Sequence, residues 1–195
     1  MRTDKLFYEL CRGSSQVLSA LLQRKTPCDY TGWSISLKER ERQIDLIFIP
    51  EEKGKEVYIV EFQGYYEKYF YLYHCRRTFQ TLEDYDLIDY PWKLISVFLS
   101  REFDPNWDKW KKKLHLKDSF PLERIYLEDL PQEYWDQSPT PWALLQVLFL
   151  KSKEDLKETF SKLEKRVRAQ KVLIAEKEEQ VDLLIQIVEN QIPQT

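Results

Sequence analysis

The protein has 195 residues, of which 43% are hydrophobic and 14% aromatic, and this composition excludes an intrinsically disordered chain. The 30 basic residues nearly balance the 33 acidic ones, so the net charge of -3 excludes a protein that binds nucleic acid through its overall charge. Four glycines are too few for a glycine-rich phosphate loop, which excludes dinucleotide-binding and P-loop folds. Three widely spaced cysteines, with no apolar leader or membrane-length segment, predict a cytoplasmic protein without a membrane partner.

The first third of the chain passes from helical to strand-like periodicity. Apolar residues at helical spacing predict helices over residues 4–10 and 16–23. Alternation of apolar and polar residues from Trp33 predicts a half-buried strand. Two β-rich runs, over residues 43–49 and 57–63, flank a polar segment that contains Pro50 and Gly54. These runs therefore predict two strands joined as a β-hairpin.

Further elements follow the hairpin. The pattern predicts a helix over 65–85, strands near 94–99 and 124–127, and a buried helix over 142–150. The basic stretch between the two later strands is predicted as a loop or a short helix. Together these elements predict an α/β fold.

The C-terminal segment has a heptad pattern, which divides the chain into a domain over residues 1–150 and a long helix over 151–195. Its seam positions are spaced alternately four and three apart: Leu156, Phe160, Leu163, Val167, Gln170, Ile174, Lys177, Val181, Leu184 and Val188. Two interpretations stay open. The helix lies on the body of its own chain, or it forms a coiled coil that pairs two chains into a homodimer.

Two acidic residues interrupt the β-rich runs. Asp45 and Glu61 lie where both faces of a strand are predicted to be buried, and a buried carboxylate is costly unless it is paired, protonated or bound to a cation. A hairpin symmetric about Lys53 places residue 45 opposite residue 61, with Gln63 on the same face. Two facing carboxylates are suited to Mg²⁺. The alternative is a register slip, or separate pairing with the nearby bases Lys38, Arg40 and Arg42.

The order of these motifs resembles the PD-(D/E)XK nuclease superfamily, in which one strand carries an Asp and the next carries (Asp/Glu)-x-Lys. It is more closely similar to the Rpn-type family of bacterial recombination-promoting nucleases and transposase-like proteins. The matching stretches are TDKLFYEL at residues 3–10, SLKE at 36–39, RQID at 42–45 and VEFQ at 60–63. The resemblance implies a mixed central sheet flanked by helices, with the restriction-endonuclease-like αβββαβ core.

The same resemblance implies a metal-dependent DNA endonuclease that hydrolyses phosphodiester bonds in recombination or transposition, with Mg²⁺ or Mn²⁺ as cofactor. Asp45 and Glu61 would be metal ligands, and Glu9 of the first helix would support the metal. Gln63 stands where the superfamily usually has Lys, so it can orient a water but supplies no charge. The missing positive charge is then expected from Lys38, with Lys68 as the second candidate.

Contacts with DNA are expected from local basic groups. Arg76 and Arg77 follow an aromatic run in the helix after the hairpin, and the only concentrated basic run contains Lys111, Lys112 and Lys113. The favoured interpretation of the aromatic run is a core-facing helix side. The alternative is a surface that stacks on bases.

A rival hypothesis is a catalytically degraded nuclease scaffold that binds DNA or assembles into oligomers. The absence of the motif's Lys supports it. This rival predicts a stable dimer without Mg²⁺-dependent cleavage.

Overall fold

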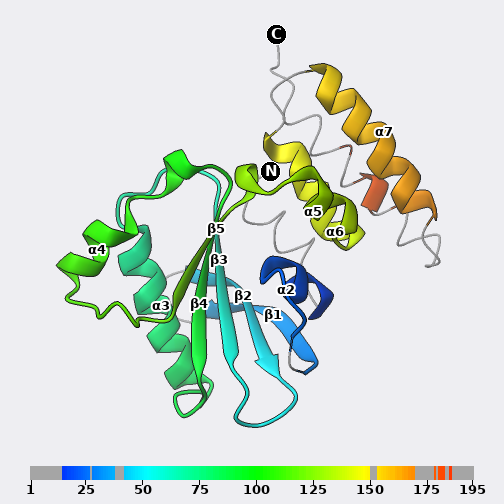
Figure 1. Ribbon diagram of the computed structural model, residues 1–195. Coiled ribbons are helices and arrows are strands. Elements are labelled where there is room, and N and C mark those ends of the chain that lie inside the picture. The colour runs from blue at the N-terminus through cyan, green and yellow to red at the C-terminus, as the bar shows by residue number, and fades with distance from the viewer. Residues whose placement is uncertain are drawn as a thin grey trace. The chain divides into compact units, whose positions relative to one another are not determined.

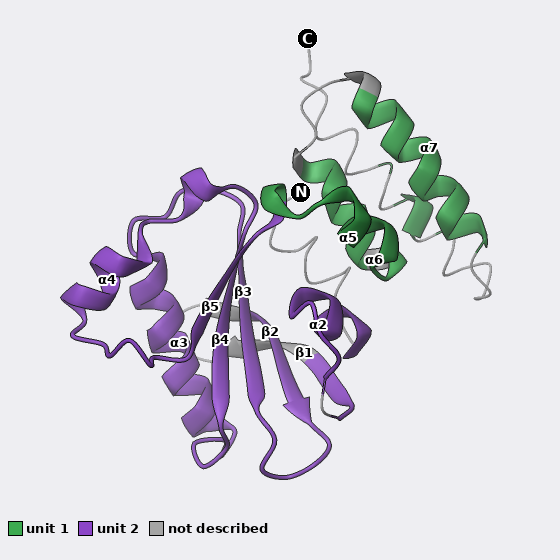
Figure 2. Ribbon diagram, in the orientation of Figure 1, with its two compact units in different colours: residues 1, 128–195 green, residues 2–127 purple. Residues whose placement is uncertain are grey.

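The computed structural model describes residues 15–26, 28–37, 42–149 and 153–169, with residues 178, 180–182 and 185. The chain divides into two compact units, Arg2–Leu127 and Glu128–Thr195 with Met1 (Figure 2). The sequence-based boundary at residue 150 rests on periodicity and stays a prediction. The helix predicted over residues 4–10 lies outside the described residues.

The larger unit is built on a five-stranded mixed sheet (Figure 1). Its strands, in spatial as well as chain order, are β1 (Tyr30–Leu37), β2 (Arg42–Pro50), β3 (Val57–Gln63), β4 (Trp92–Phe98) and β5 (Leu122–Tyr126). β1 is antiparallel to β2 and β2 is antiparallel to β3, whereas β4 runs parallel to β3 and β5 runs parallel to β4. This arrangement confirms the predicted α/β class with a mixed sheet.

The central strand β3 is buried along its whole length. Its residues belong to the most β-branched and aromatic run of the chain, which suits a strand covered on both faces. On one face, Ile59 packs with Leu94 of β4 and with Leu82 of the helix α3 (Phe70–Asp84). The helix α2 (Ser15–Leu21) buries its own apolar residues, and Figure 1 shows α2 and α3 on either side of the sheet.

The helix α3 is the crossover that a parallel β3–β4 pair requires. Its buried residues recur at helical spacing: Phe70, Tyr71, His74, Cys75, Thr78, Thr81 and Leu82. The Cys75 thiol is among them, and its burial raises its pKa to about 11, so it stays protonated and unreactive.

The second crossover contains the basic stretch, which forms the turn η1 (Arg101–Phe103) and the helix α4 (Trp107–Lys113). The Asn106 side chain caps α4 by accepting the Lys109 backbone N–H at 3.1 Å. Of the two predicted alternatives for this stretch, the short helix is therefore correct.

The smaller unit is helical. After η2 (Leu127–Asp129), which spans the division, it contains α5 (Gln132–Gln137), α6 (Thr140–Ala143), η3 (Leu144–Phe149) and α7 (Lys153–Ala169). The predicted buried helix over 142–150 is thus the end of a short α-helix followed by a 3-10 segment. Trp142, Leu144 and Leu145 in this region are fully buried.

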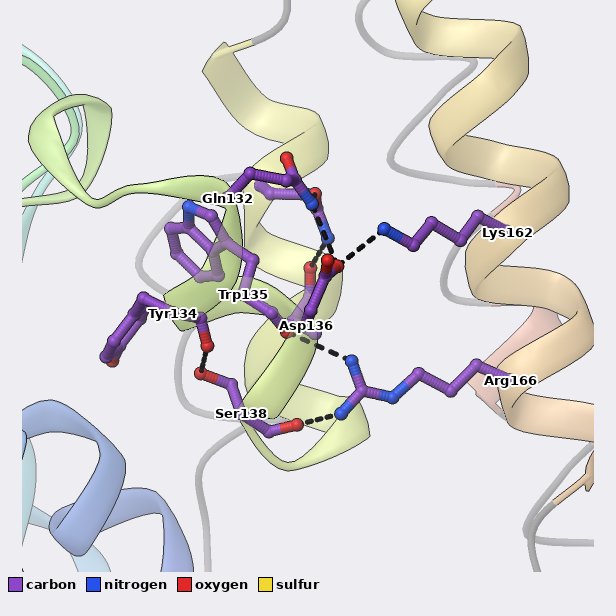
Figure 3. Close-up of polar contacts among 9 residues, drawn as sticks. Gln132, Tyr134, Trp135, Asp136, Ser138, Lys162 and Arg166 are labelled. Atoms are coloured by element: carbon purple, nitrogen blue, oxygen red, sulfur yellow. Dashed lines mark hydrogen bonds and ion pairs between the residues drawn. The ribbon is translucent and has the colours of Figure 1, made fainter.

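The helix α7 is held to α5 by polar contacts. Arg166 donates to the backbone carbonyls of Trp135, at 3.0 Å, and of Ser138 (Figure 3). Leu163 and Val167 on the predicted heptad seam are buried at 1% and 0% exposure. This part of the seam therefore packs within its own chain, as the first interpretation expects. Most seam positions beyond residue 169 lie outside the described residues, so pairing of two chains stays a prediction.

In the parts of the chain that the structure describes, no helix combines the length and apolar character needed to cross a membrane.

Candidate acidic site at the end of the hairpin

The predicted hairpin register is confirmed. Strand β2 pairs with β3 through Leu46 and Val60, Ile47 and Ile59, and Phe48 and Tyr58, which is a hairpin symmetric about Lys53. These pairs end at Leu46 and Val60, and Asp45 and Glu61 are the next residues on their strands. The two acidic residues thus occupy adjoining positions on neighbouring strands.

Asp45 lies at an irregularity of β2. The pairing with β1 shifts from Trp33–Ile47 to Ile35–Ile44, so three steps along β2 match two steps along β1. An extra residue of this kind is a β-bulge, which bends a strand and re-aims its side chains. On the other side, the Asp45 Oδ2 atom accepts the backbone N–H of Phe62 at 2.8 Å. The bulge and this bond hold the Asp45 carboxylate against β3, directly beside the backbone of Glu61.

Glu61 is buried, with 3% of its surface exposed, and it pairs with Arg77 of α3. The distance from the Arg77 guanidinium to Glu61 Oε1 is 3.1 Å. Residues 43–49 and 57–63 contain no base to offset the acids, but α3 supplies one. Arg77 was expected to contact DNA, and the structure places its guanidinium beside the Glu61 carboxylate. Its helical spacing from the buried residues Phe70, His74 and Thr81 is the signal that identifies this inward position.

Gln63 lies on β3, two residues from Glu61. We call Asp45, Glu61 and Gln63 together the acidic row. The Gln63 side chain is buried, and its amide nitrogen donates to the backbone carbonyl of Tyr65. This bond ties the amide to the loop that leads into α3. Because side chains alternate along a strand, Gln63 and Glu61 share one face of the sheet.

His74 lies beside this row and is fully buried. Its Nδ1 atom is 3.1 Å from the hydroxyl of Ser96, the residue that β4 places next to Glu61. Burial, and to a smaller extent the charge of Arg77, lowers the His74 pKa to about 3. His74 is therefore a neutral core residue. His115, the other histidine, is exposed.

The donor set suits a hard cation. Asp45, Glu61 and Gln63 offer carboxylate and amide oxygens, which Mg²⁺ and Mn²⁺ prefer over the nitrogen and sulfur ligands typical of zinc. Within the described ranges, no three acidic, histidine or cysteine side chains gather at one point. A third protein ligand would thus come from the Gln63 amide or from Glu9. Glu9 and Lys38 lie outside the residues whose side chains the structure describes.

The other predicted DNA contacts lie on α3 and α4. Arg76, Lys112 and Lys113 are exposed. Lys111 bonds the Asp118 carboxylate at 2.7 Å, and this bond raises the pKa of Lys111. Lys111 is therefore engaged by an acid, whereas the other three present their charge at the surface.

The aromatic run divides between core and surface. Phe70 and Tyr71 are 2% and 0% exposed, which confirms the core-facing interpretation for them. The same interpretation is wrong for Tyr65, Tyr66 and Tyr69, which are 54%, 58% and 41% exposed. The three exposed tyrosines precede the first residue of α3, so the helix does not turn them toward the sheet.

A second acidic centre lies on the same face of the sheet. The Asp104 carboxylate accepts hydrogen bonds from the hydroxyls of Tyr71 and Tyr126, at 2.8 and 2.6 Å. It also accepts from Arg124 at 3.1 Å and from the backbone N–H of Asn106 at 2.8 Å. Sequence reasoning missed this centre because its members are far apart along the chain and form no motif.

The chain belongs to a family of unknown function whose sequence model covers almost all of its residues. Residues 3–195 match the family described as "Protein of unknown function (DUF2887)", so the chain is a member of that family. Neither the curated proteins nor the solved structures include a significant match.

Proposed function

We propose that this protein is a Mg²⁺-dependent DNA endonuclease of the PD-(D/E)XK superfamily, related to the Rpn-type recombination-promoting nucleases. The observation that carries the proposal is the placement of Asp45 and Glu61 on adjacent strands, at a β-bulge where the described hairpin pairing ends. Like charges so close together repel, and a divalent cation between them would convert the repulsion into attraction.

The order of elements supports the proposal. Three antiparallel strands are followed by a helix and by a fourth strand parallel to the third, which is the βββαβ order of a restriction-endonuclease-like core. The acids stand on the second and third strands of that order, as they do in the PD-(D/E)XK pattern.

Each residue of the row has a distinct task in this proposal. Asp45 is oriented by the Phe62 N–H, and Glu61 is oriented by Arg77, so both carboxylates are held before substrate arrives. A bound divalent cation would neutralise charge on the scissile phosphate and lower the pKa of an attacking water. Gln63 would orient that water through its amide.

The positive charge that the motif lacks has two sources in this proposal. Lys38 is the first, from the sequence. Arg77 is the second, because its guanidinium already lies at Glu61 and an Arg can hold a phosphate oxygen through several N–H groups. Dimerisation through the C-terminal helix and a role in recombination belong to the same proposal.

The test is cleavage of supercoiled plasmid by the purified chain in Mg²⁺. Asp45→Asn and Glu61→Gln keep the size of each side chain and remove its charge, so both should lower nicking on the order of 10²- to 10³-fold. Glu123→Gln is the matched control, because Glu123 is an acid on β5 that pairs with Lys93 away from the acidic row. Thermal melting followed by circular dichroism shows that each variant is folded. Mg²⁺-dependent nicking that survives both acid substitutions would overturn the assignment.

One observation favours the rival function, a degraded scaffold that binds DNA without cutting it. Arg77 already neutralises Glu61, and a cation that fills this role leaves less need for a metal. The rival predicts that DNA binding persists in EDTA and that Mg²⁺ yields no cleavage. Isothermal titration of Mg²⁺ into the wild-type chain and the Asp45→Asn variant separates the two: the nuclease should bind the ion and the variant should not.

A further inference from the structure

Exposed aromatic side chains gather at the entrance to α3. Tyr65 and Tyr66 are more than half exposed, and Tyr69 is 41% exposed. Further along α3, Leu72 is 40% exposed at the position one turn from Tyr69. Large apolar side chains grouped on a surface mark an interaction site more often than isolated ones do.

The helix α4 extends this group. The Tyr69 ring lies edge-on to the Trp110 ring, with centroids 5.9 Å apart, so α4 sits beside the first turns of α3 (Figure 1). Lys68 places its ammonium 5.2 Å from the centre of the Tyr69 ring, and Lys113 lies 5.1 Å from that of Trp110. We call the surface formed by these residues the aromatic surface: Tyr65, Tyr66, Lys68, Tyr69, Leu72, Arg76 and Lys113.

The aromatic surface is positively charged. Lys68, Arg76 and Lys113 are all exposed, and Lys112 lies next to them in the sequence of α4. Glu67 is the acid inside this segment, and its carboxylate accepts the backbone N–H of Tyr69 at 3.0 Å. Positive charge interleaved with exposed rings complements a partner that has both phosphates and flat apolar faces.

The aromatic surface is continuous with the acidic row. Gln63 donates to the carbonyl of Tyr65, so the end of β3 and the start of the surface are joined by a hydrogen bond. On α3, the neighbours Arg76 and Arg77 point in different directions: Arg76 is exposed, and Arg77 pairs with Glu61. A strand lying on the aromatic surface would therefore reach the end of β3, two residues from Glu61.

We infer that the aromatic surface binds unpaired bases, so that the substrate is single-stranded or locally unpaired DNA rather than continuous duplex. The naming of DNA rests on the proposed function. The choice of unpaired DNA rests on the rings, because a base offers its flat face to a tyrosine only when it is not stacked inside a duplex. Lys68, Arg76 and Lys113 would hold the phosphates between the stacked bases.

The experiment is fluorescence anisotropy with labelled 20-nucleotide oligo-dT and a 20-base-pair duplex, in EDTA so that no cleavage occurs. The full chain should bind the single strand at least tenfold more tightly than the duplex. Tyr65→Leu with Tyr66→Leu should weaken single-strand binding roughly 5- to 100-fold, whereas the corresponding Phe variants keep the ring and should stay within twofold of wild type. Tyr85→Leu is the matched control, because Tyr85 is 46% exposed at the opposite end of α3.

Three results would overturn the inference: equal affinity for duplex and single strand, unchanged affinity in the Leu variants, or equal losses in the Leu and Phe variants. Sedimentation of the same variants tests whether the surface instead binds a second copy of this chain. If the Leu pair turns a self-associated protein into a monomer without changing DNA affinity, the surface is a contact between copies of this chain. Absence of Mg²⁺-dependent plasmid cleavage would overturn the nuclease proposal, whereas these binding measurements decide the role of the surface by themselves.

Discussion

The sheet face beneath α3 holds two acidic centres with opposite surroundings. Asp104 is a single carboxylate that accepts from two tyrosine hydroxyls, one arginine and one backbone N–H. Asp45 and Glu61 are two carboxylates on adjoining strand positions, one bonded by a backbone N–H and the other by Arg77. The first centre gathers donors around one charge, whereas the second brings two like charges together.

This difference distinguishes a structural centre at Asp104 from a candidate functional site at Asp45 and Glu61. Burial raises the Tyr126 pKa to about 12 and raises the Tyr71 pKa above its ordinary value, so both hydroxyls keep their protons and continue to donate to Asp104. The Asp104 centre joins the loop before α4 to α3 and β5, and its chemistry is complete without a ligand. Paired acids raise the energy of the folded chain unless a cation joins them. A buried carboxylate surrounded by donors, such as Asp104, needs no cation, so burial alone does not identify a functional centre.

The largest expected effect is on cleavage, and it should be confined to the paired acids. Asp45→Asn keeps an acceptor for the Phe62 N–H and removes one negative charge, so we expect plasmid nicking to fall on the order of 10²- to 10³-fold with the fold intact. Single-turnover cleavage and chemical denaturation of the same preparation measure the two quantities. An equally large loss of cleavage in a folded Asp104→Asn variant would contradict the distinction between the two centres.

Asp104→Asn should instead lower stability. The substitution leaves Arg124 and the two tyrosine hydroxyls without the charge that they surround, and we expect a loss of about 3 kcal/mol in the free energy of unfolding. Urea denaturation followed by tryptophan fluorescence measures it. Tyr126→Phe removes one donor and should cost less, about 1 kcal/mol. Equal stability of Asp104→Asn and wild type would show that the carboxylate does not anchor the loop.

Acid should destabilise the protein through His74, near the paired acids. The His74 pKa is about 3 in the folded chain against 6.5 ordinarily, so the unfolded chain binds the proton first. Above pH 6.5 the buried neutral His74 carries no penalty, and the free energy of unfolding declines as the pH falls from 6.5 toward 3. We expect a loss of about 2 kcal/mol between pH 7 and pH 5 from this group.

Urea denaturation at both pH values measures that loss, with two histidine variants as comparisons. His74→Asn removes the titrating ring and should reduce the pH dependence. His115→Asn removes the exposed histidine and should leave the dependence as in wild type. If the two variants respond to pH in the same way, the buried histidine is not its source.

The smallest effect is expected for a partly exposed ion pair. Lys93 and Glu123 are 2.6 Å apart on neighbouring strands, with about a quarter and a third of their side chains exposed. Glu123→Gln should change the free energy of unfolding by about 0.5 kcal/mol, and by less in 1 M salt. A loss as large as that of Asp104→Asn would mean that burial does not distinguish the acids of this sheet.

Local pattern accounts for most of the predicted elements. The run over residues 57–63 has the bounds of β3, and the symmetric register of the hairpin is correct, because both depend on residues within one short segment. The pattern also predicted that Asp45 and Glu61 would face each other. It did not predict the bulge at Asp45, because the bulge arises from pairing with β1 and not from β2 alone.

The sequence by itself determined the order of the strands and the register of the β2–β3 hairpin, because side-chain periodicity and turn length act locally. The tertiary structure decided which charge lies against Glu61, which tyrosines remain exposed, and that the first part of the α7 seam is buried within its own chain. Each of these outcomes depends on an element distant in the chain, such as α3 above β3 or α7 beside α5. Burial and charge pairing are properties of such contacts between elements, and no periodicity within one element contains them.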